Sequence, residues 1–264
     1  MKKVIAILMS ICMLTVFAGC GKSSSKADSE YVKEKGKLII GITDFKPMDY
    51  EEKQGSGDWI GFDADMAKAF AKELGVEAEF TVINWDNKTF ELDGKSIDCV
   101  WNGMTLTDGV KQAMETSKPY CVNEQVVVVK ADKKDVYNSK EAIKGLNFSA
   151  EQGSAGEEVL QKLGYKVTPI GSQADAVKEV AAGTSDAAVI DLLMAGAVIG
   201  EGTSYPDLVY TTSLSEEKEE YGVGFRKGSD LAQKLNDFFK KSYDDGSMLE
   251  TAKKYGVQES LVKQ

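Results

Sequence analysis

Apolar and polar residues alternate along this chain with the periods of short buried strands and amphipathic helices. Three apolar runs in the first part predict strands, at residues 37–42, 78–83 and 97–101. The segment 62–74 carries an apolar stripe at helical spacing, with Asp63 placed to cap its start and Gly75 just past its end. A shorter helix is expected at 89–92. This alternation of strands and helices predicts a parallel sheet with crossover helices.

A second series of elements follows a run of four valines within residues 125–130, which predicts a fully buried strand. Further strands are expected at 146–150, 167–170 and 187–190, with helices at 153–163, 173–182 and 192–199. The chain closes with a strand at 221–226 that has the character of the first series, and helices at 230–243 and 248–255. Two α/β series with polar strand ends predict two lobes and a cleft that closes on a ligand.

The N-terminus has the pattern of a secretory signal. Two lysines precede an apolar run at 4–17, which is shorter than the roughly 20 residues that span a bilayer. The run closes at Cys20 in a sequence that resembles a bacterial lipobox. We therefore expect a lipoprotein signal peptide at 1–20, a lipid on Cys20, a flexible tether at 21–35 and an extracytoplasmic, membrane-anchored protein. An ordinary signal peptide or an uncleaved anchor is the alternative.

Composition excludes several functional classes. The formal net charge is −10, with 32 basic and 42 acidic residues, which argues against a nucleic-acid partner. The chain contains no histidine, so the usual general base and most zinc sites are missing, and we expect no metal and no cofactor. Arg226 is the only arginine. Cys99 and Cys121 could pair, but their β-favouring surroundings favour buried thiols.

The stretch 98–120 has the pattern of a small-molecule binding site at the end of a strand. A strand from Cys99 to Trp101 runs into Asn102-Gly103, which can turn the chain and expose backbone N–H groups. Thr105 and Thr107 follow, and then a predicted helix. Polar groups gathered at the end of a sheet strand form a common type of small-molecule site.

Several motifs, in their order and spacing, give the chain a family resemblance. They are Gly61-Phe62-Asp63, Asn84-Trp85-Asp86, residues 103–107, 117–120, Gln152-Gly153-Ser154, 188–191 and 221–228. With these motifs the chain resembles the family 3 solute-binding proteins of polar amino acid ABC importers. The resemblance implies a periplasmic-binding-protein-like fold of type II, with two α/β lobes joined by two hinge strands. Lobe 1 would comprise 36–121 and 213–264, and lobe 2 would comprise 122–212.

The resemblance also implies a set of ligand-binding positions. They are Asp44, Phe45, Trp85, Asn102, Gly103, Thr105, Val110, Glu151, Ser154 and Asp191. The family places a carboxylate for the ligand's amino group at Asp191, a hydroxyl at Ser154 and an aromatic at Trp85. From the residues alone, Asp191 and Ser154 could equally be helix N-caps, and the aromatics could belong to the core.

Val110 is the departure from the family, because the arginine that binds the ligand's α-carboxylate falls at this position. Hydrogen bonds to charged groups are worth about 1.5–3 kcal/mol each, so the loss predicts roughly ten- to a hundred-fold weaker binding unless the site changed. In one hypothesis an amino acid rests on Ser154, Thr105 and helix N-terminal amides. In the other, a basic amino acid, an amine or a polyamine is held by Asp191, Glu151 and Asp44.

The expected function is therefore the substrate-binding component of an ABC importer. It would be a monomer that captures an amino acid or related amine by lobe closure and delivers it to a membrane permease. The hinges are predicted at 120–125 and 209–214. The alternatives are an enzyme of the small-acid dehydratase type, with Glu151 or Glu124 as acid or base, and a ligand-sensing lipoprotein.

Overall fold

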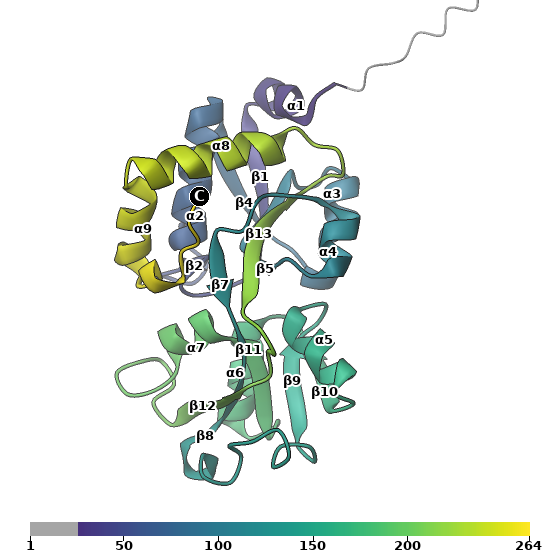
Figure 1. Ribbon diagram of the computed structural model, residues 1–264, viewed down its shortest axis with the longest axis vertical. Helices are drawn as coiled ribbons and strands as arrows, with labels where there is room; N and C mark the ends of the chain where they lie inside the picture. The colour runs from purple at the N-terminus through teal and green to yellow at the C-terminus, as the bar shows by residue number, and fades with distance from the viewer. Residues whose placement is uncertain (1–25) are drawn as a thin grey trace, which may run out of the picture.

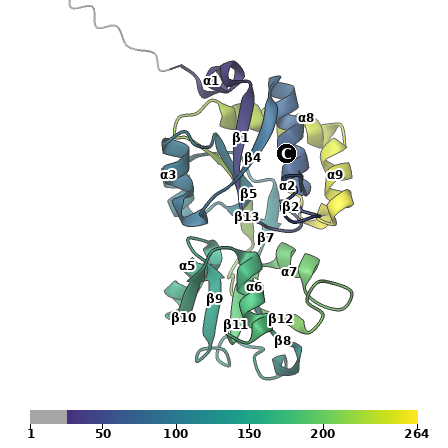
Figure 2. The same ribbon diagram turned by 180° about the vertical axis from the view of Figure 1, so that it is seen from behind.

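The computed structural model describes residues 26–264, which form two lobes arranged along the long axis of the molecule (Figure 1). Each lobe has a central sheet covered by helices, and two chain segments run between the lobes (Figures 1 and 2). The predicted signal peptide 1–20, with its lipid site Cys20, lies outside the described residues. No helix within 26–264 is long and apolar enough to cross a membrane.

Lobe 1 is built on a mixed sheet. Its strands are β1 (Lys37–Ile42), β4 (Glu77–Val82), β5 (Cys99–Thr105), β6 (Glu115–Thr116), β7 (Cys121–Asn123) and β13 (Glu219–Phe225), with a hairpin of β2 (Tyr50–Glu51) and β3 (Trp59–Ile60). The sheet order is β4-β1-β5-β13-β6, and β7 also pairs with β13. Because β1 runs parallel to both β4 and β5, the predicted crossover arrangement is confirmed.

The helices of lobe 1 come from both ends of the chain. They are α1 (Asp28–Lys35), α2 (Phe62–Leu74), α3 (Lys88–Asp93), α4 (Asp108–Ala113), α8 (Leu231–Asp244) and α9 (Ser247–Tyr255), with 3₁₀ turns η1 (Trp85–Asn87) and η3 (Gln258–Ser260). Large side chains fill the space between these helices and the sheet. Trp101 belongs to this core, as expected, and its ring packs against Phe70 and Phe239.

Lobe 2 has a five-stranded sheet in the order β10-β9-β11-β8-β12. Its elements are β8 (Gln125–Lys130), η2 (Ala131–Lys133), β9 (Asn147–Glu151), α5 (Ala155–Lys162), β10 (Lys166–Ile170), α6 (Gln173–Ala182), β11 (Ala187–Asp191), α7 (Leu192–Val198) and β12 (Leu208–Ser213). All four valines of β8 are buried, as their run predicted. Helix α5 of this lobe lies on the same side of the molecule as α3 of lobe 1 in both views (Figures 1 and 2).

Strand β5 differs from its prediction, because it continues through Asn102-Gly103 to Thr105 instead of turning. Gly103 takes a φ of 54° and its N–H donates to Asp63 Oδ2 at 2.7 Å. A Cβ at this glycine would lie 2.5 Å from the Phe45 ring, so only glycine fits the strand here. Asp63 also accepts from the Tyr120 hydroxyl at 2.6 Å. It therefore links three segments of lobe 1, and the prediction that it caps α2 is wrong, since Gly61 occupies that position.

The predicted tether at 21–35 is too long, because residues from Asp28 onward form α1. The Val32 side chain is fully buried in the core of lobe 1. Ser29 donates to Asp230 through its backbone N–H at 2.9 Å and through its hydroxyl at 2.5 Å. These contacts with the C-terminal part of the chain hold a helix that has no strong amphipathic signal of its own.

The two crossings between the lobes lie close together. The first occurs at Glu124, between β7 and β8, within the predicted hinge 120–125. The second occupies 214–218, beyond most of the predicted hinge 209–214, because β12 stays paired with β8 up to Ser213. The N–H of Leu214 donates to the carbonyl of Gln125 at 2.8 Å, which joins the two crossings directly.

The two cysteines of lobe 1 are unpaired and buried, which confirms the expectation of thiols. Cys99 starts β5 and Cys121 starts β7, on strands that pair with β13. Burial raises the pKa of both thiols well above the ordinary value, so neither is a reactive thiolate at neutral pH.

Candidate functional site

Polar strand ends of the two lobes meet around a small cavity of about 20 Å³. It is lined by Trp85, Asn102, Gly103 and Thr105 of lobe 1, and by Gln125, Glu151, Ser154, Ala155, Gln173 and Asp191 of lobe 2. Seven of the ten predicted ligand-binding positions are therefore brought together here. The volume suits about one water molecule, so admitting an amino acid requires the lobes to move apart.

Asp191 ends β11 immediately before α7 and is 3 % exposed. One carboxylate oxygen accepts from the side-chain amides of Asn123 and Gln125, the latter at 2.7 Å, and the other accepts from Gln173. Burial raises the pKa of Asp191 to about 7, the charge of Glu219 adds to the rise, and the amide donors oppose it. The carboxylate makes no cap hydrogen bond to α7, so its hydrogen bonds orient it without neutralising it.

Glu151 ends β9 and is almost fully buried beside the same cavity. Its Oε1 atom has no hydrogen-bond partner. Burial raises the pKa of Glu151 to about 8, the side chain of Thr43 and the ammonium of Lys88 oppose the rise, and the charge of Asp191 adds to it. A buried carboxyl oxygen without a partner is costly, and a cationic or hydrogen-bonding ligand group would remove that cost.

Ser154 and Thr105 offer hydroxyl groups from opposite lobes. Ser154 caps α5, because its Oγ accepts from the N–H of Glu157 at 3.1 Å, which leaves the hydroxyl proton free to donate. Thr105 donates to Glu219 Oε2 at 3.2 Å. Ser154 therefore offers a free hydroxyl donor to a carboxylate, whereas the hydroxyl proton of Thr105 is already used by Glu219. The N-cap expectation for Ser154 is confirmed and is compatible with a ligand role.

Asn102 has a positioning role in lobe 1. Its side-chain oxygen accepts from the N–H and the hydroxyl of Thr43, and its amide donates to Asp49 Oδ2 at 2.8 Å. These hydrogen bonds fix the end of β1 against β5. The amide side chain is thus used within the protein, although Asn102 reaches the cavity surface.

Phe45 lies away from the cavity walls and belongs to the core of lobe 1, at 2 % exposure. Its ring meets the Tyr221 ring edge-on, with centroids 6.4 Å apart. Its backbone N–H donates to the carbonyl of Asp49 in a tight turn, which directs the side chain inward. The structure therefore places this predicted ligand contact in the core.

Val110 and Lys88 line a second cavity between the lobes, of about 200 Å³. Trp85, Thr105, Thr107, Gly153, Ser154 and Glu158 are also among its lining residues. Val110 is in the first turn of α4, where Thr107 caps its N–H, and its side chain joins an apolar cluster that includes Trp85. The position that carries arginine in the family thus presents an apolar wall.

Sequence reasoning missed Lys88. This residue starts α3, is 9 % exposed, and donates from Nζ to the carbonyls of Trp85 at 3.1 Å and Gly153 at 3.0 Å. Its Nζ also lies 5.0 Å from the centroid of the Trp85 ring. A lysine three positions after a predicted site aromatic was the available signal.

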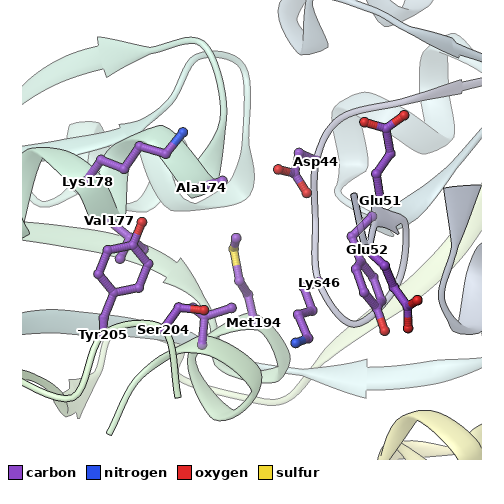
Figure 3. Close-up of a pocket in the computed structure, with 12 residues that line it drawn as sticks. Asp44, Lys46, Glu51, Glu52, Ala174, Val177, Lys178, Met194, Ser204 and Tyr205 are labelled. Atoms are coloured by element: carbon purple, nitrogen blue, oxygen red, sulfur yellow. The ribbon is translucent and has the colours of Figure 1, made fainter. Parts of the chain in front are cut away.

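A third, larger cavity of about 540 Å³ lies between the lobes beside α6 and α7. Figure 3 shows Asp44, Lys46, Glu51 and Glu52 on the lobe 1 side and Lys178, Met194, Ser204 and Tyr205 on the lobe 2 side. Burial raises the pKa of Asp44, while the charge of Lys178 opposes the rise. The predicted position Asp44 is therefore separate from the small cavity that contains Asp191.

Arg226 lies at the far end of lobe 1 from these cavities. Its guanidinium donates to Asp28 at 3.0 Å, to Asp98 at 3.3 Å and to the carbonyl of Ile97 at 2.8 Å. These buried partners account for the guanidinium, so the single arginine has a structural role. No group of three or more potential metal ligands gathers anywhere within 26–264.

Comparisons with known proteins agree with this architecture. The arginine-binding extracellular protein ArtP of Bacillus subtilis is 29% identical, over 97% of this chain and 98% of its own length. The L-cystine-binding protein TcyJ of Escherichia coli is 27% identical, over 94% of each chain. A mutant of ArgBP from T. maritima has a similar structure, with a TM-score of 0.79 and 30% identity over 86% of this chain and 98% of that one.

All three relatives are binding proteins by name, which supports a binding role for this chain rather than a catalytic one. Residues 38–258 match the family described as bacterial extracellular solute-binding proteins, family 3. The match spans both lobes, both crossings and every predicted ligand-binding position. The chain therefore belongs to family 3 of the bacterial extracellular solute-binding proteins.

Proposed function

We propose that this protein captures an amino acid or related small amine by closure of its two lobes and delivers it to a membrane permease of an ABC importer. One observation carries the proposal: two buried carboxyls of lobe 2, Glu151 and Asp191, border one cavity with Trp85 and Thr105 of lobe 1. Neither carboxyl has a cation within ion-pair distance in residues 26–264. A ligand ammonium would provide that charge, and closure would shield the pair from water.

The relatives narrow the class of ligand. One is named for arginine binding and another for cystine binding, so both take molecules with an amino group and a carboxylate. The acidic character of the cleft favours a ligand whose amino group is charged. Asp44 in the larger cavity supports a second cationic group on the ligand, as in a basic amino acid.

Binding can be measured by calorimetry and thermal shift on the purified protein. The probes are the twenty amino acids, ornithine, cystine, putrescine and spermidine. A ligand at a thousand times its Kd stabilises the folded state by about 4 kcal/mol, which raises Tm by several degrees in a protein of this size. If none of these probes produces heat or a shift in Tm, the proposal is wrong.

The location proposed for the protein is the outer face of the cell membrane, with a lipid on Cys20. The family is extracellular, and the lipobox-like sequence before Cys20 supports the anchor. We propose a monomer that meets the permease while tethered. Cys20→Ala should release the protein from membrane pellets into the soluble fraction, whereas Cys99→Ala should leave it in the pellet. An unchanged distribution of Cys20→Ala would contradict the lipid anchor.

A further inference from the structure

Lys88 stands apart among the buried cations of the protein. Within residues 26–264 the buried basic residues are Lys88 and Arg226. Arg226 is paired with two carboxylates, whereas no carboxylate lies within ion-pair distance of Lys88. A buried charge without a counter-charge is unfavourable, and such a group at a ligand cavity points to a partner supplied from outside.

The local contacts of Lys88 leave it able to take that partner. Two carbonyl oxygens accept from Nζ, one from Trp85 in lobe 1 and one from Gly153 in lobe 2. An ammonium has three donors, so one remains. The more distant charges of Glu151, Asp86 and Glu158 favour its protonated form, while burial lowers the pKa of Lys88.

The groups around this ammonium suit a carboxylate. The same 200 Å³ cavity is lined by Thr107 and Ser154, whose hydroxyl protons are free to donate. Thr105, whose hydroxyl donates to Glu219, and the carboxylate of Glu158 also line it. Hydroxyl donors, the N-terminus of an eight-residue helix and a buried cation together form an anion site. Val110 contributes an apolar surface to this cavity, so Lys88 is the cation available there.

We propose that Lys88 binds the carboxylate of the ligand, in place of an arginine on α4. This inference rests on the proposed function and sharpens it, because it selects α-amino acids over amines that lack a carboxylate. The ligand carboxylate meets Lys88 and Ser154, and the ligand ammonium meets Glu151 and Asp191. The counter-charge thus comes from α3 instead of α4.

The test compares amino acids with their decarboxylated counterparts. Calorimetry is run with each of the twenty amino acids, and with the corresponding amine and methyl ester of every one that binds. The unmodified protein should bind the acid at least tenfold more tightly than either carboxylate-free form. In Lys88→Met the affinity for the acid should fall at least tenfold, while that for the amine should change less than threefold. Lys88→Arg should keep the preference for the acid.

Lys72→Met is the matched control, because Lys72 is exposed on α2 of the same lobe and should leave both affinities unchanged. An equal loss for acid and amine would mean that Lys88 only joins the lobes through Gly153, which overturns the proposal. An unmodified protein that binds amine and ester as well as the acid overturns it without any variant, while the proposed function survives. No binding of any amino acid or amine would overturn the proposed function as well.

Discussion

The two ends of strand β5 carry two different kinds of buried charge. Asp98, just before the strand, is fully buried and accepts from the Ile39 N–H at 2.8 Å, from Lys35 at 2.5 Å and from Arg226 at 3.3 Å. At the other end, Thr105 reaches the cavities lined by Lys88 and Glu151, two buried ionisable groups that form no ion pair within residues 26–264.

We propose that this difference separates buried charges that stabilise the fold from buried ionisable groups that bind the ligand. At the Asp98 end, every cation and carboxylate has its partner inside the protein. Removing one member therefore leaves a buried charge whose desolvation cost is no longer offset. In the second group no ion-pair partner lies within residues 26–264, and burial raises the pKa of the carboxyls and lowers that of the ammonium. Perturbed groups of this type gather at functional sites.

The largest effect on stability is expected at the Asp98 end. Arg226→Met should lower the free energy of unfolding by about 3 kcal/mol, because Asp98 would stay buried with Lys35 as its remaining cation. Urea denaturation followed by circular dichroism measures this loss. Ligand affinity should stay within twofold of the unmodified protein. A stable variant with weakened binding would contradict the separation of the two ends.

The largest effect on binding is expected at Asp191. Asp191→Asn should weaken ligand binding at least a hundredfold, about 2.7 kcal/mol, because the ligand ammonium loses its counter-charge. Calorimetry provides the affinity, and circular dichroism verifies that the variant is folded. Asp207→Asn changes an exposed carboxyl in the same lobe and should have no effect. Equal affinities in the two variants would show that the ligand site lies elsewhere.

Glu151→Gln should change the pH dependence of stability. The folded pKa of Glu151 is raised from 4.5 to about 8, so the unfolded state releases this proton first as pH rises. The contribution of Glu151 to the free energy of unfolding is therefore fully present below pH 4.5 and is lost as the pH rises towards 8. The loss is about 3 kcal/mol between pH 5 and pH 8. Asp191 and Lys88 act on this carboxyl, and Asp191 titrates in both proteins, so the difference between the two urea-stability curves isolates Glu151. Parallel curves would contradict the prediction.

The smallest effect is expected at Phe45, where a variant distinguishes a core residue from a ligand-binding residue. Phe45→Leu should lower the free energy of unfolding by about 1–2 kcal/mol, since it replaces the buried ring that packs against Tyr221 with a smaller side chain. Its ligand affinity should stay within twofold. A tenfold loss of affinity without a loss of stability would return Phe45 to the ligand site.

Local patterns in the sequence predicted the elements well. The helix at 62–74 and the helix at 173–182 have the predicted bounds, and Gly75 ends the first in a left-handed conformation. Strand 37–42 also matches. Each of these elements follows from periodicity and end signals that lie within the segment itself.

The features that the sequence did not predict depend on contacts between distant segments. Asp63 looked like a helix cap, but its partners Gly103 and Tyr120 lie 40 and 57 positions away along the chain. The sequence likewise could not reveal that Lys88 comes to the carbonyl of Gly153, in the other lobe. Tertiary packing decided both cases, and no window of local sequence contains that information.

With the lipid that we propose on Cys20, helix α1 would shorten the tether between the protein and the membrane. Its contacts with the C-terminal part of the chain mean that folded structure begins at residue 28 rather than at residue 36. With a lipid on Cys20, a tether from 21 to 27 would reach at most about 25 Å at 3.3–3.6 Å per residue. This is about half the reach of the tether 21–35 that the sequence predicted. A tether of that length would keep the protein close to the bilayer, where the local concentration near the proposed permease would stay high.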